Sequence, residues 1–553
     1  MTQNQTARPP VQVLAARKIV TMTPAQPEAT HVALRDGRIL AVGGPAEMAA
    51  WPEAEQVDTF RDKVLMPGLV EAHCHLMEGA MWDAVYVGYF DRRDPDGHLW
   101  RGLKTLDQVI DRLASAESQL KDADRPLLAW GFDPIYFGTE RLSVRELDRV
   151  SPTRPIVVMH ASVHLMNVNS AMLALAGIDE DTDIDGVHKD AGGMPTGELQ
   201  EFAAMFPVHR VIGAGLSLAA AENPEAIRRF GRVAQLAGVT TATDLVSDLS
   251  PLGLQTLQAV TAEDAFPLRV VPAFAPQRNP DGGPARVLAA MASGTGKLHF
   301  GPVKFIVDGS IQGFTARLRA PGYAGGQPNG LWLIPPGQLE ETFTPFHLAG
   351  MQLHIHTTGD EATEVVLDAL DAMLARHPRA DHRHTLQHCQ LADETQLRRA
   401  AGLGLCINFF ANHLYYWGDA HATQTVGPER AARMNPANSA RRLGIPFSLH
   451  SDAPITPLNP LFTAWCAASR QSATGRVLGE DERLLLDDAL HAVTLGAAYT
   501  LRLDPLVGSI EAGKLADFAV LEDDPAALGA ERLKDVRVWG TVLGGRAFPA
   551  PGK

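Results

Sequence analysis

The sequence predicts an α/β fold built around a (β/α)8 TIM-like barrel, with an inserted subdomain and a small β-sandwich made from both termini. Three observations lead to this prediction. Eight short apolar runs alternate with helical patterns in the middle of the chain, a long segment separates the first two runs, and the two chain ends share a pattern of short strands. The 553 residues exceed what a barrel needs, which is about 250, so substantial additions are expected.

The two ends of the chain have similar strand patterns. Near the start, "VQVLAARKIVTM" and "HVALRDGRILAVGG" are alternating or β-branched runs, and "RDGR" is typical of a hairpin turn. Near the end, "GSIEAGKLADFAVLEDDP" and "VRVWGTVLGGRAF" show the same features. Neither end can bury a core alone, so we expect one sandwich from residues 1–63 and 484–553, the second range also holding the last helix.

The middle of the chain, 64–483, has the alternation expected of a barrel. The eight strand candidates are "KVLMPGLVEAH", "GVTTATDL", "LRVVPAF", "GPVKFIVDGS", "MQLHIHTTGD", "HTLQHCQL", "GLCINF" and "PFSLHSDAP". Helical patterns such as "EATEVVLDALDAMLARH" lie between most of them, which indicates parallel βα units. The gap after the first strand is too long for one crossover, so we expect an insertion over about 77–225.

Composition excludes several classes of partner. The formal net charge of −15 argues against a nucleic-acid partner, because phosphate contacts need a basic surface. The four cysteines are far apart and form no CxxC, so no disulfide framework is expected. We find no apolar signal region at the N-terminus and no 18-residue apolar run. A cytoplasmic protein that acts on a small molecule, with no membrane partner, is the expectation.

Polar side chains gather where the predicted strands end, which is where barrel enzymes place their active sites. His73 and His75 face the same side because they lie two residues apart on a strand. Alone, this HxH pair is weak evidence for a metal. Three later strands end in similar residues: His354 and His356, His384 and His388, and His450 and Asp452.

Lys304 is unusual because it lies inside a strand between apolar residues, where a cation is costly to bury. It is either a salt-bridged core lysine or a lysine of lowered pKa. In the second case, the neutral amine can react with carbon dioxide to form a carbamate, an anion able to bridge two cations.

The sequence resembles the amidohydrolase superfamily, and more narrowly its family 3 branch, which includes N-substituted formamide deformylases. The matching pieces are "PGLVEAHCHL", "VKFIVDGSIQGFTARL", "HIHTTGDEA", "TLQHCQL", "NHLYYWGD", "LHSDAPITPLNP" and "GSIEAGKLADFAVL". They cover most of the chain in order. Together they are specific to the branch, though not to one substrate.

The resemblance implies a two-metal site. His73 and His75 would bind the first ion and His356 and His388 the second. Carboxylated Lys304, formed with carbon dioxide, would bridge the ions, and Asp452 would complete the first site and carry protons. Such nitrogen and oxygen ligands suit two zinc ions, although manganese or iron is also compatible, and the ions would share a nucleophilic hydroxide. A homodimer is a further expectation at the level of the family.

Other histidines and one carboxylate have competing interpretations. His354 could face the cavity or hold a ligand, and we expect packing or support roles for His384 and His450. Asp360 is expected to cap the following helix or to bond a ligand histidine.

The expected substrate contacts come from weaker patterns. His164, in a segment resembling the family's, could bond the substrate carbonyl or simply start a helix. Phe314 stands where the wider family has an arginine, which suggests an apolar substrate. The other candidates, each also explicable as packing, are Glu201, Asn412, His413, Tyr416, Trp82 and Tyr136.

The leading hypothesis is therefore a metal-dependent hydrolase that cleaves the C–N bond of an apolar N-substituted amide. An N-substituted formamide, giving amine and formate, is the best single candidate. A carbamate or cyclic amide, or an aminohydrolase reaction on a heterocycle, are alternatives, and Lys304 counts against the last. A scaffold without activity is a remote alternative because every expected ligand position is filled.

Overall fold

The computed structural model describes residues 9–122, 124–138, 140–213, 216 and 220–551. Its centre is a parallel eight-stranded sheet with the strands in sequence order, which confirms the barrel prediction. All eight predicted strands are present. They are β6 (Leu69–Glu71), β15 (Val239–Ser247), β16 (Arg269–Phe274), β17 (Pro302–Ile306), β18 (Gln352–Thr357), β19 (Thr385–His388), β20 (Cys406–Phe409) and β21 (Phe447–Leu449).

The first and last barrel strands meet just beyond their ends. The amide of Asp452 donates to the carbonyl of His73 at 3.1 Å, and the amide of His75 donates to the carbonyl of Ala453 at 2.8 Å. Cys74 and Ala453 form a parallel bridge at this point. The sheet is thus joined into a barrel at the residues that carry the HxH motif.

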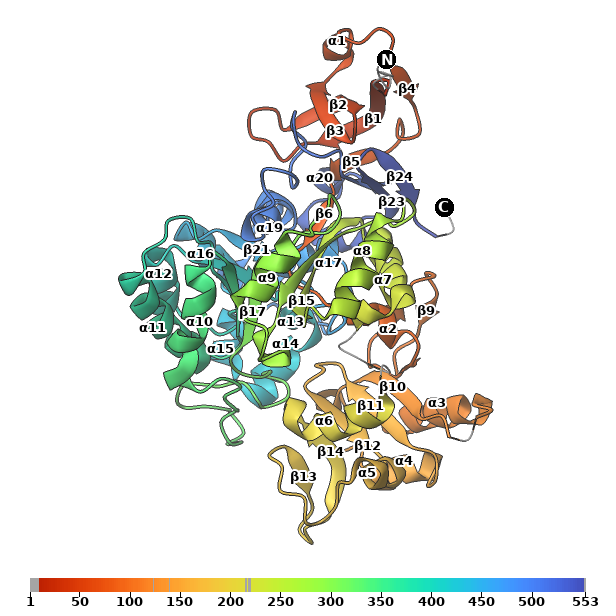
Figure 1. The fold of residues 1–553 in the computed structure, drawn as a ribbon, viewed down its shortest axis with the longest axis vertical. Coiled ribbons are helices and arrows are strands. Elements are labelled where there is room, and N and C mark those ends of the chain that lie inside the picture. The colour runs from red at the N-terminus through yellow and green to blue at the C-terminus, as the bar shows by residue number, and fades with distance from the viewer. Residues whose placement is uncertain (1–8, 123, 139, 214–215, 217–219, 552–553) are drawn as a thin grey trace, which may run out of the picture.

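Helices connect and surround the barrel strands (Figure 1). Side chains define where several of them begin: Asn223 accepts from two amides of the first turn of its helix, and Asp393 forms a capping box with Gln396. The surrounding helices are α7 (Pro224–Leu236), α8 (Pro251–Ala262), α9 (Pro284–Met291), α10 (Leu339–Leu348), α11 (Asp360–Arg376), α12 (Glu394–Gly402), α13 (Asn412–Tyr416), α16 (Ala437–Arg442), α17 (Pro460–Ser469), α18 (Leu486–Ala492) and α19 (Leu495–Thr500).

Strands from both ends of the chain form one eight-stranded sheet, at the top of Figure 1. Asp36 and Gly37 both have positive φ, as a two-residue hairpin turn requires, and they join β2 to β3. The strands share a core that includes Leu14, Leu65 and Phe518. They are β1 (Gln12–Val20), β2 (Glu28–Arg35), β3 (Arg38–Gly43), β4 (Glu55–Val57), β5 (Val64–Pro67), β22 (Phe518–Leu521), β23 (Val538–Leu543) and β24 (Arg546–Pro549).

The first predicted strand is divided between two sheets. Its first half, β5, pairs with β1 and β22 in the terminal sheet, and its second half, β6, is the first barrel strand. Gly68 stands between them, where an added Cβ would lie 2.0 Å from Oγ1 of Thr240. Any larger residue would therefore push the two sheets apart at this crossing.

The insertion between β6 and β15 forms a unit of its own, at the bottom of Figure 1. Its sheet has the order β13-β14-β12-β11-β10-β7, flanked by helices and by the hairpin β8–β9. The strands are β7 (Val85–Tyr86), β8 (Arg92–Arg93), β9 (Leu99–Trp100), β10 (Leu127–Phe132), β11 (Ile156–His160), β12 (Leu165–Val168), β13 (Val187–Lys189) and β14 (Pro195–Gln200). The helices are α2 (Met77–Met81), α3 (Leu106–Gln119), α4 (Val144–Val150), α5 (Ser170–Ala176) and α6 (Glu201–Ile212).

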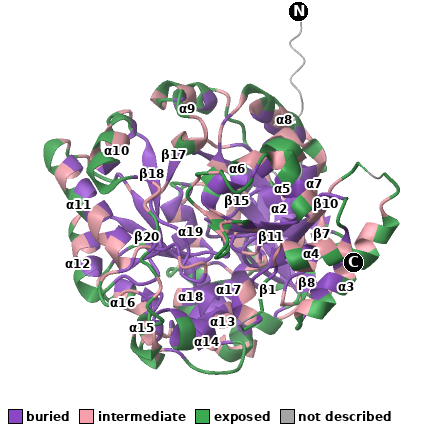
Figure 2. Ribbon diagram, turned by 90° about the horizontal axis from the view of Figure 1, so that it is seen from below, coloured by how far each residue is buried: buried purple, intermediate pink, exposed green. Residues whose placement is uncertain are grey.

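Burial is concentrated in the barrel strands and in the helix faces that cover them, as Figure 2 shows from below. Among the described residues, no helix is both long and apolar enough to cross a membrane.

Candidate metal centre

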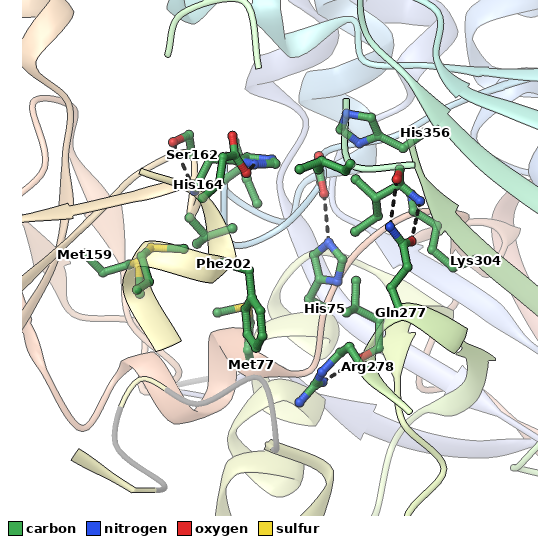
Figure 3. Close-up of a pocket in the computed structure, with 18 of the residues that line it drawn as sticks. His75, Met77, Met159, Ser162, His164, Phe202, Gln277, Arg278, Lys304 and His356 are labelled. Atoms are coloured by element: carbon green, nitrogen blue, oxygen red, sulfur yellow. Dashed lines mark hydrogen bonds and ion pairs between the residues drawn. The ribbon is translucent and has the colours of Figure 1, made fainter. Parts of the chain in front are cut away.

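A cavity of about 430 Å³ opens at the end of the barrel where the strands finish. One wall consists of polar side chains from the barrel, including His75, Lys304 and His356, and the other comes largely from the insertion (Figure 3). All six residues expected to hold metal line this cavity: His73, His75, Lys304, His356, His388 and Asp452.

His73, His75 and Asp452 form a compact group of possible metal ligands. Their ligand atoms lie within 4.8 Å of one another, and all three residues are buried. Oδ1 of Asp452 is 3.1 Å from Nε2 of His75 and 3.3 Å from Nε2 of His73. Burial raises the pKa of Asp452, but the hydrogen bond to His75 and nearby positive charges lower it by more, so the net shift is downward. The carboxylate is thus ionised at neutral pH.

The ring of His73 is held by an amide that the sequence did not single out. Nδ1 of His73 lies 2.7 Å from Oε1 of Gln387, so Nδ1 carries the proton and Nε2 faces the cavity. The orientation of Gln387 is fixed in turn, because its Oε1 accepts from Asn408 at 3.0 Å and its Nε2 donates to Nδ1 of His354 at 2.7 Å. His354 therefore supports Gln387 rather than a predicted ligand directly, and it does not line the cavity.

Lys304 lies in β17 with its side chain inside the barrel. It is 1% exposed, and its Nζ is 3.3 Å from Nε2 of His73. No carboxylate lies within salt-bridge distance of this amine among the described residues, which argues against a salt-bridged core lysine. Burial lowers the pKa of Lys304 to about 7. A substantial share of the amine is consequently neutral at physiological pH.

His356 and His388 lie beside each other with ring centroids 4.3 Å apart and ring planes at 70°. Nε2 of His356 contacts the carbonyl of Gly309 at 3.2 Å, which leaves Nδ1 as the nitrogen available to a ligand. Nδ1 of His388 is 3.7 Å from Oδ2 of Asp452, whereas its Nε2 is buried without a partner among the described residues. Burial lowers the pKa of both rings well below the usual value, so both are neutral.

Left-handed backbone turns two of these side chains toward the cavity. His388 has φ of 69° and Asp452 has φ of 54°, values that non-glycine residues seldom adopt. His388 ends β19, and this conformation breaks the alternation that places Gln387 inside the barrel. Strained backbone of this kind is typical of functional sites.

His450 is close to the site but does not fit as a shared ligand with His73. Their rings are nearly parallel, at 16°, with centroids 4.5 Å apart. Because an imidazole binds a metal in its own ring plane, two face-to-face rings cannot converge on one ion. His450 also does not line the cavity, although both its nitrogens are buried without partners among the described residues.

Most of the expected substrate contacts lie elsewhere. Of that group only Glu201 lines the large cavity, as does His164, whose Nδ1 is 2.9 Å from Oε2 of Glu201. The other assignments are corrected because each side chain is engaged outside the cavity. The ring of Phe314 packs on Tyr323, Asn412 donates to Thr456, His413 bonds His421, Trp82 packs on Trp130, and the hydroxyl of Tyr136 donates to the carbonyl of Tyr416.

Tyr136 and Tyr416 instead border a separate space of about 30 Å³ lined by aromatic rings. Ile455 touches both cavities. The aromatic density that suggested a substrate wall therefore reflects packing between the insertion and the barrel loops.

His384 bonds His347 of α10 at 2.8 Å, so it packs against the helix layer, one of the two roles expected for it. The role of Asp360 differs from expectation. Asp360 neither caps α11, whose N-cap is Gly359, nor bonds a ligand histidine. Its Oδ1 accepts from the amide of Arg319 and from the guanidinium of Arg430. Asp308 is the carboxylate nearest His356, at 3.6 Å from its Nε2.

The wall opposite the predicted ligands is largely apolar, and no motif in the sequence indicates it. Met77, Met159 and Met205 line it with Phe202, and Figure 3 shows Met77, Met159 and Phe202 grouped away from Lys304 and His356. These residues lie in helices and strands of the insertion, where methionine and phenylalanine are indistinguishable from core residues. Gln277 and Arg278 add polar groups to the lining.

Comparison with known proteins bears on this arrangement. A family model described as the amidohydrolase family matches residues 60–548. The chain belongs to the amidohydrolase family. This amidohydrolase is 28% identical over 539 residues to the N-substituted formamide deformylase of Arthrobacter pascens, with 94% of each chain covered. It is 27% identical over 550 residues to protein LONG AFTER FAR-RED 3 of Arabidopsis thaliana, covering 96% of this chain and 90% of that one.

Among solved structures, an uncharacterized metal-dependent hydrolase from Pyrococcus horikoshii OT3 has a TM-score of 0.70 at 21% identity. The match covers 94% of this chain and 99% of that one, and it establishes a shared fold.

The side chains of this amidohydrolase also suit a metal. The imidazoles of His73 and His75 and the carboxylate of Asp452 converge, with ligand atoms within 4.8 Å of one another, and the buried nitrogens Nδ1 of His75 and Nε2 of His388 lack partners among the described residues.

Proposed function

We propose that this amidohydrolase cleaves the C–N bond of an N-substituted amide with an apolar substituent, and that an N-substituted formamide, yielding amine and formate, is its substrate. The observation that carries the proposal is the two-sided cavity. Polar ligand residues occupy one wall, and Met77, Met159, Phe202 and Met205 occupy the other. A small acyl group fits beside the ligands while an apolar substituent packs on the opposite wall.

The relative named N-substituted formamide deformylase supports this choice of substrate. Phe314, which the sequence offers as a sign of an apolar substituent, does not line the cavity. The apolar substituent is supported by the apolar wall instead.

His73, His75 and Asp452 would hold one zinc ion and His356 and His388 a second. Lys304 would lie between them as a carbamate, formed when its neutral amine attacks carbon dioxide and releases a proton. Manganese or iron could replace zinc with the same ligands. When bound, the ions would lower the pKa of water and polarise a carbonyl oxygen.

The chain's own groups would complete the reaction. Asp452 would accept a proton from the attacking water and pass it to the leaving amine nitrogen. His164, facing the cavity from the insertion, would donate a hydrogen bond to the carbonyl oxygen.

A hydrolysis screen of the purified protein tests the proposal. Zinc and bicarbonate would be supplied, and N-benzylformamide compared with N-benzylacetamide, an N-benzylcarbamate and a cyclic amide. We expect the formamide to be hydrolysed fastest, with formate released in equal amount to benzylamine. Hydrolysis of the carbamate alone would overturn the formamide assignment, and activity that survives complete removal of metal would overturn the metal centre.

A further inference from the structure

We infer that Glu201 is a positioning residue, which holds His164 so that one ring nitrogen faces the reacting carbonyl, and that the insertion thereby contributes to catalysis. The inference rests on the proposed function for the identity of the carbonyl. This positioning role differs from the direct substrate contact that the sequence suggests for Glu201.

The two residues meet because of strand pairing inside the insertion. β12 and β14 are antiparallel, with Leu165 opposite Gln200, so the residues just outside this pair are His164 and Glu201. The amide of Glu201 donates to the carbonyl of His164 at 2.7 Å. The strand pairing thus places His164 and Glu201 side by side, joined by a backbone hydrogen bond.

The hydrogen bond between the side chains fixes the proton on the ring. Nδ1 of His164 lies 2.9 Å from Oε2 of Glu201, and an ionised carboxylate only accepts, so Nδ1 must donate. Nε2 is then the nitrogen that can meet a ligand, and it donates to a carbonyl oxygen when the ring is the doubly protonated imidazolium. His164 lines the cavity, and in Figure 3 it approaches from the insertion while His356 approaches from the barrel.

One oxygen of the Glu201 carboxylate bonds His164, and the other is buried without a partner among the described residues. Glu201 is 6% exposed and has φ of 61°, a strained conformation for a residue with a side chain. Its Oε1 lies close to Gly309, since a Cβ added there would be 2.8 Å from that oxygen. The carbonyl of the same glycine contacts His356 at 3.2 Å. Gly309 therefore lies near both the Glu201 carboxylate and a predicted metal ligand.

The placement of His164 suits contact with a bound carbonyl. Its ring centroid is 6.0 Å from that of His356, one of the predicted ligands. Burial lowers the pKa of His164, but the charge and hydrogen bond of Glu201 raise it by more, in contrast to the lowered pKa values of His73, His356 and His388. This direction agrees with a ring that donates a hydrogen bond.

A double-mutant cycle tests whether Glu201 acts through His164. We expect Glu201→Ala to lower kcat on N-benzylformamide by about 10–100-fold, with little change in KM or metal content, because the ring loses its orientation. In a His164→Ala background the same substitution should cost nothing further. Glu201→Gln, whose amide oxygen still accepts from Nδ1 but carries no charge, should keep the ring orientation and recover part of kcat. Glu198→Ala, in the strand β14 that directly precedes Glu201, is the matched control.

Equal losses in both backgrounds would show that Glu201 contacts the substrate itself and would overturn the inference. Crystal structures of the zinc-loaded wild type and of Glu201→Ala give an answer that does not depend on turnover. We expect the His164 ring to leave its orientation in the variant, and an unmoved ring would overturn the positioning role. If the wild type hydrolyses no amide, the proposed function fails while these structures still decide the role of Glu201.

Discussion

Asp452 and His75 are 377 positions apart in the chain, yet Oδ1 of the first lies 3.1 Å from Nε2 of the second. The backbone beside them carries the hydrogen bonds that join the first barrel strand to the last. Closure of the barrel and assembly of the candidate metal centre therefore occur at one place. A substitution at this place is therefore expected to change catalysis without disturbing the fold only if the new side chain has the same shape as the old one.

Asp452→Asn preserves shape and removes the negative charge. We expect kcat to fall by about 10²–10⁴-fold, because the amide cannot accept and return the proton of the attacking water. Circular dichroism should show an unchanged fold. Retention of more than half the wild-type activity would exclude Asp452 as the proton carrier.

Gln387→Leu should weaken metal binding without removing any ligand. Oε1 of Gln387 accepts a hydrogen bond from Nδ1 of His73, with 2.7 Å between the two atoms. Loss of such a partner typically reduces metal affinity by about 10–100-fold. Competition with a coloured chelator measures the affinity. Gln352→Leu is the matched control, because Gln352 is a buried amide of β18 bonded to carbonyls away from the cavity, including that of Thr500. Equal zinc affinity in wild type and Gln387→Leu would contradict the expectation.

Lys304→Ala should abolish activity and reduce the bound metal by at least one ion, because the carbamate proposed to bridge the two positions could not form. Added acetate or propionate should restore part of the activity by supplying a carboxylate in the space left by the side chain. Metal content can be determined by mass spectrometry. A variant with full activity would rule out the bridging role.

Asp517→Asn should destabilise the protein without touching the candidate site. Arg269 of β16 and Asp517, next to β22, form a buried ion pair at 2.5 Å between barrel and terminal sheet. Leaving one buried charge without its partner costs about 3–5 kcal/mol of unfolding free energy. Asp523→Asn, which breaks a pair with the exposed Arg537, should cost less than about 1 kcal/mol. Chemical denaturation would show whether the two losses differ as expected.

The sequence was sufficient for the barrel and for the ring of polar residues at its mouth. Periodicity located the strands, and strand ends of parallel sheets must share an edge, so His73, Lys304, His356, His388 and Asp452 could be brought together without coordinates. Whether they bind metal remains a prediction.

Other features depended on information that a linear pattern does not carry. Nothing in "KVLMPGLVEAH" shows that Gly68 separates two sheets. Gln387 is hard to single out from the sequence. Alternation along a strand predicts that Gln387 and His388 point to opposite faces, and the left-handed backbone at His388 is what turns both side chains to the inside of the barrel. The prediction that Tyr136 and Tyr416 contact the substrate is wrong because packing and binding use the same aromatic residue types.

The terminal sheet has a consequence for how the protein is made. β5 pairs with β22, so during synthesis one edge of β5 has no strand beside it until nearly the whole chain has left the ribosome. An exposed strand edge invites pairing with other chains. Nascent chains released before residues 518–521 would present this edge to each other, and their fate should depend on chaperones far more than that of the finished protein.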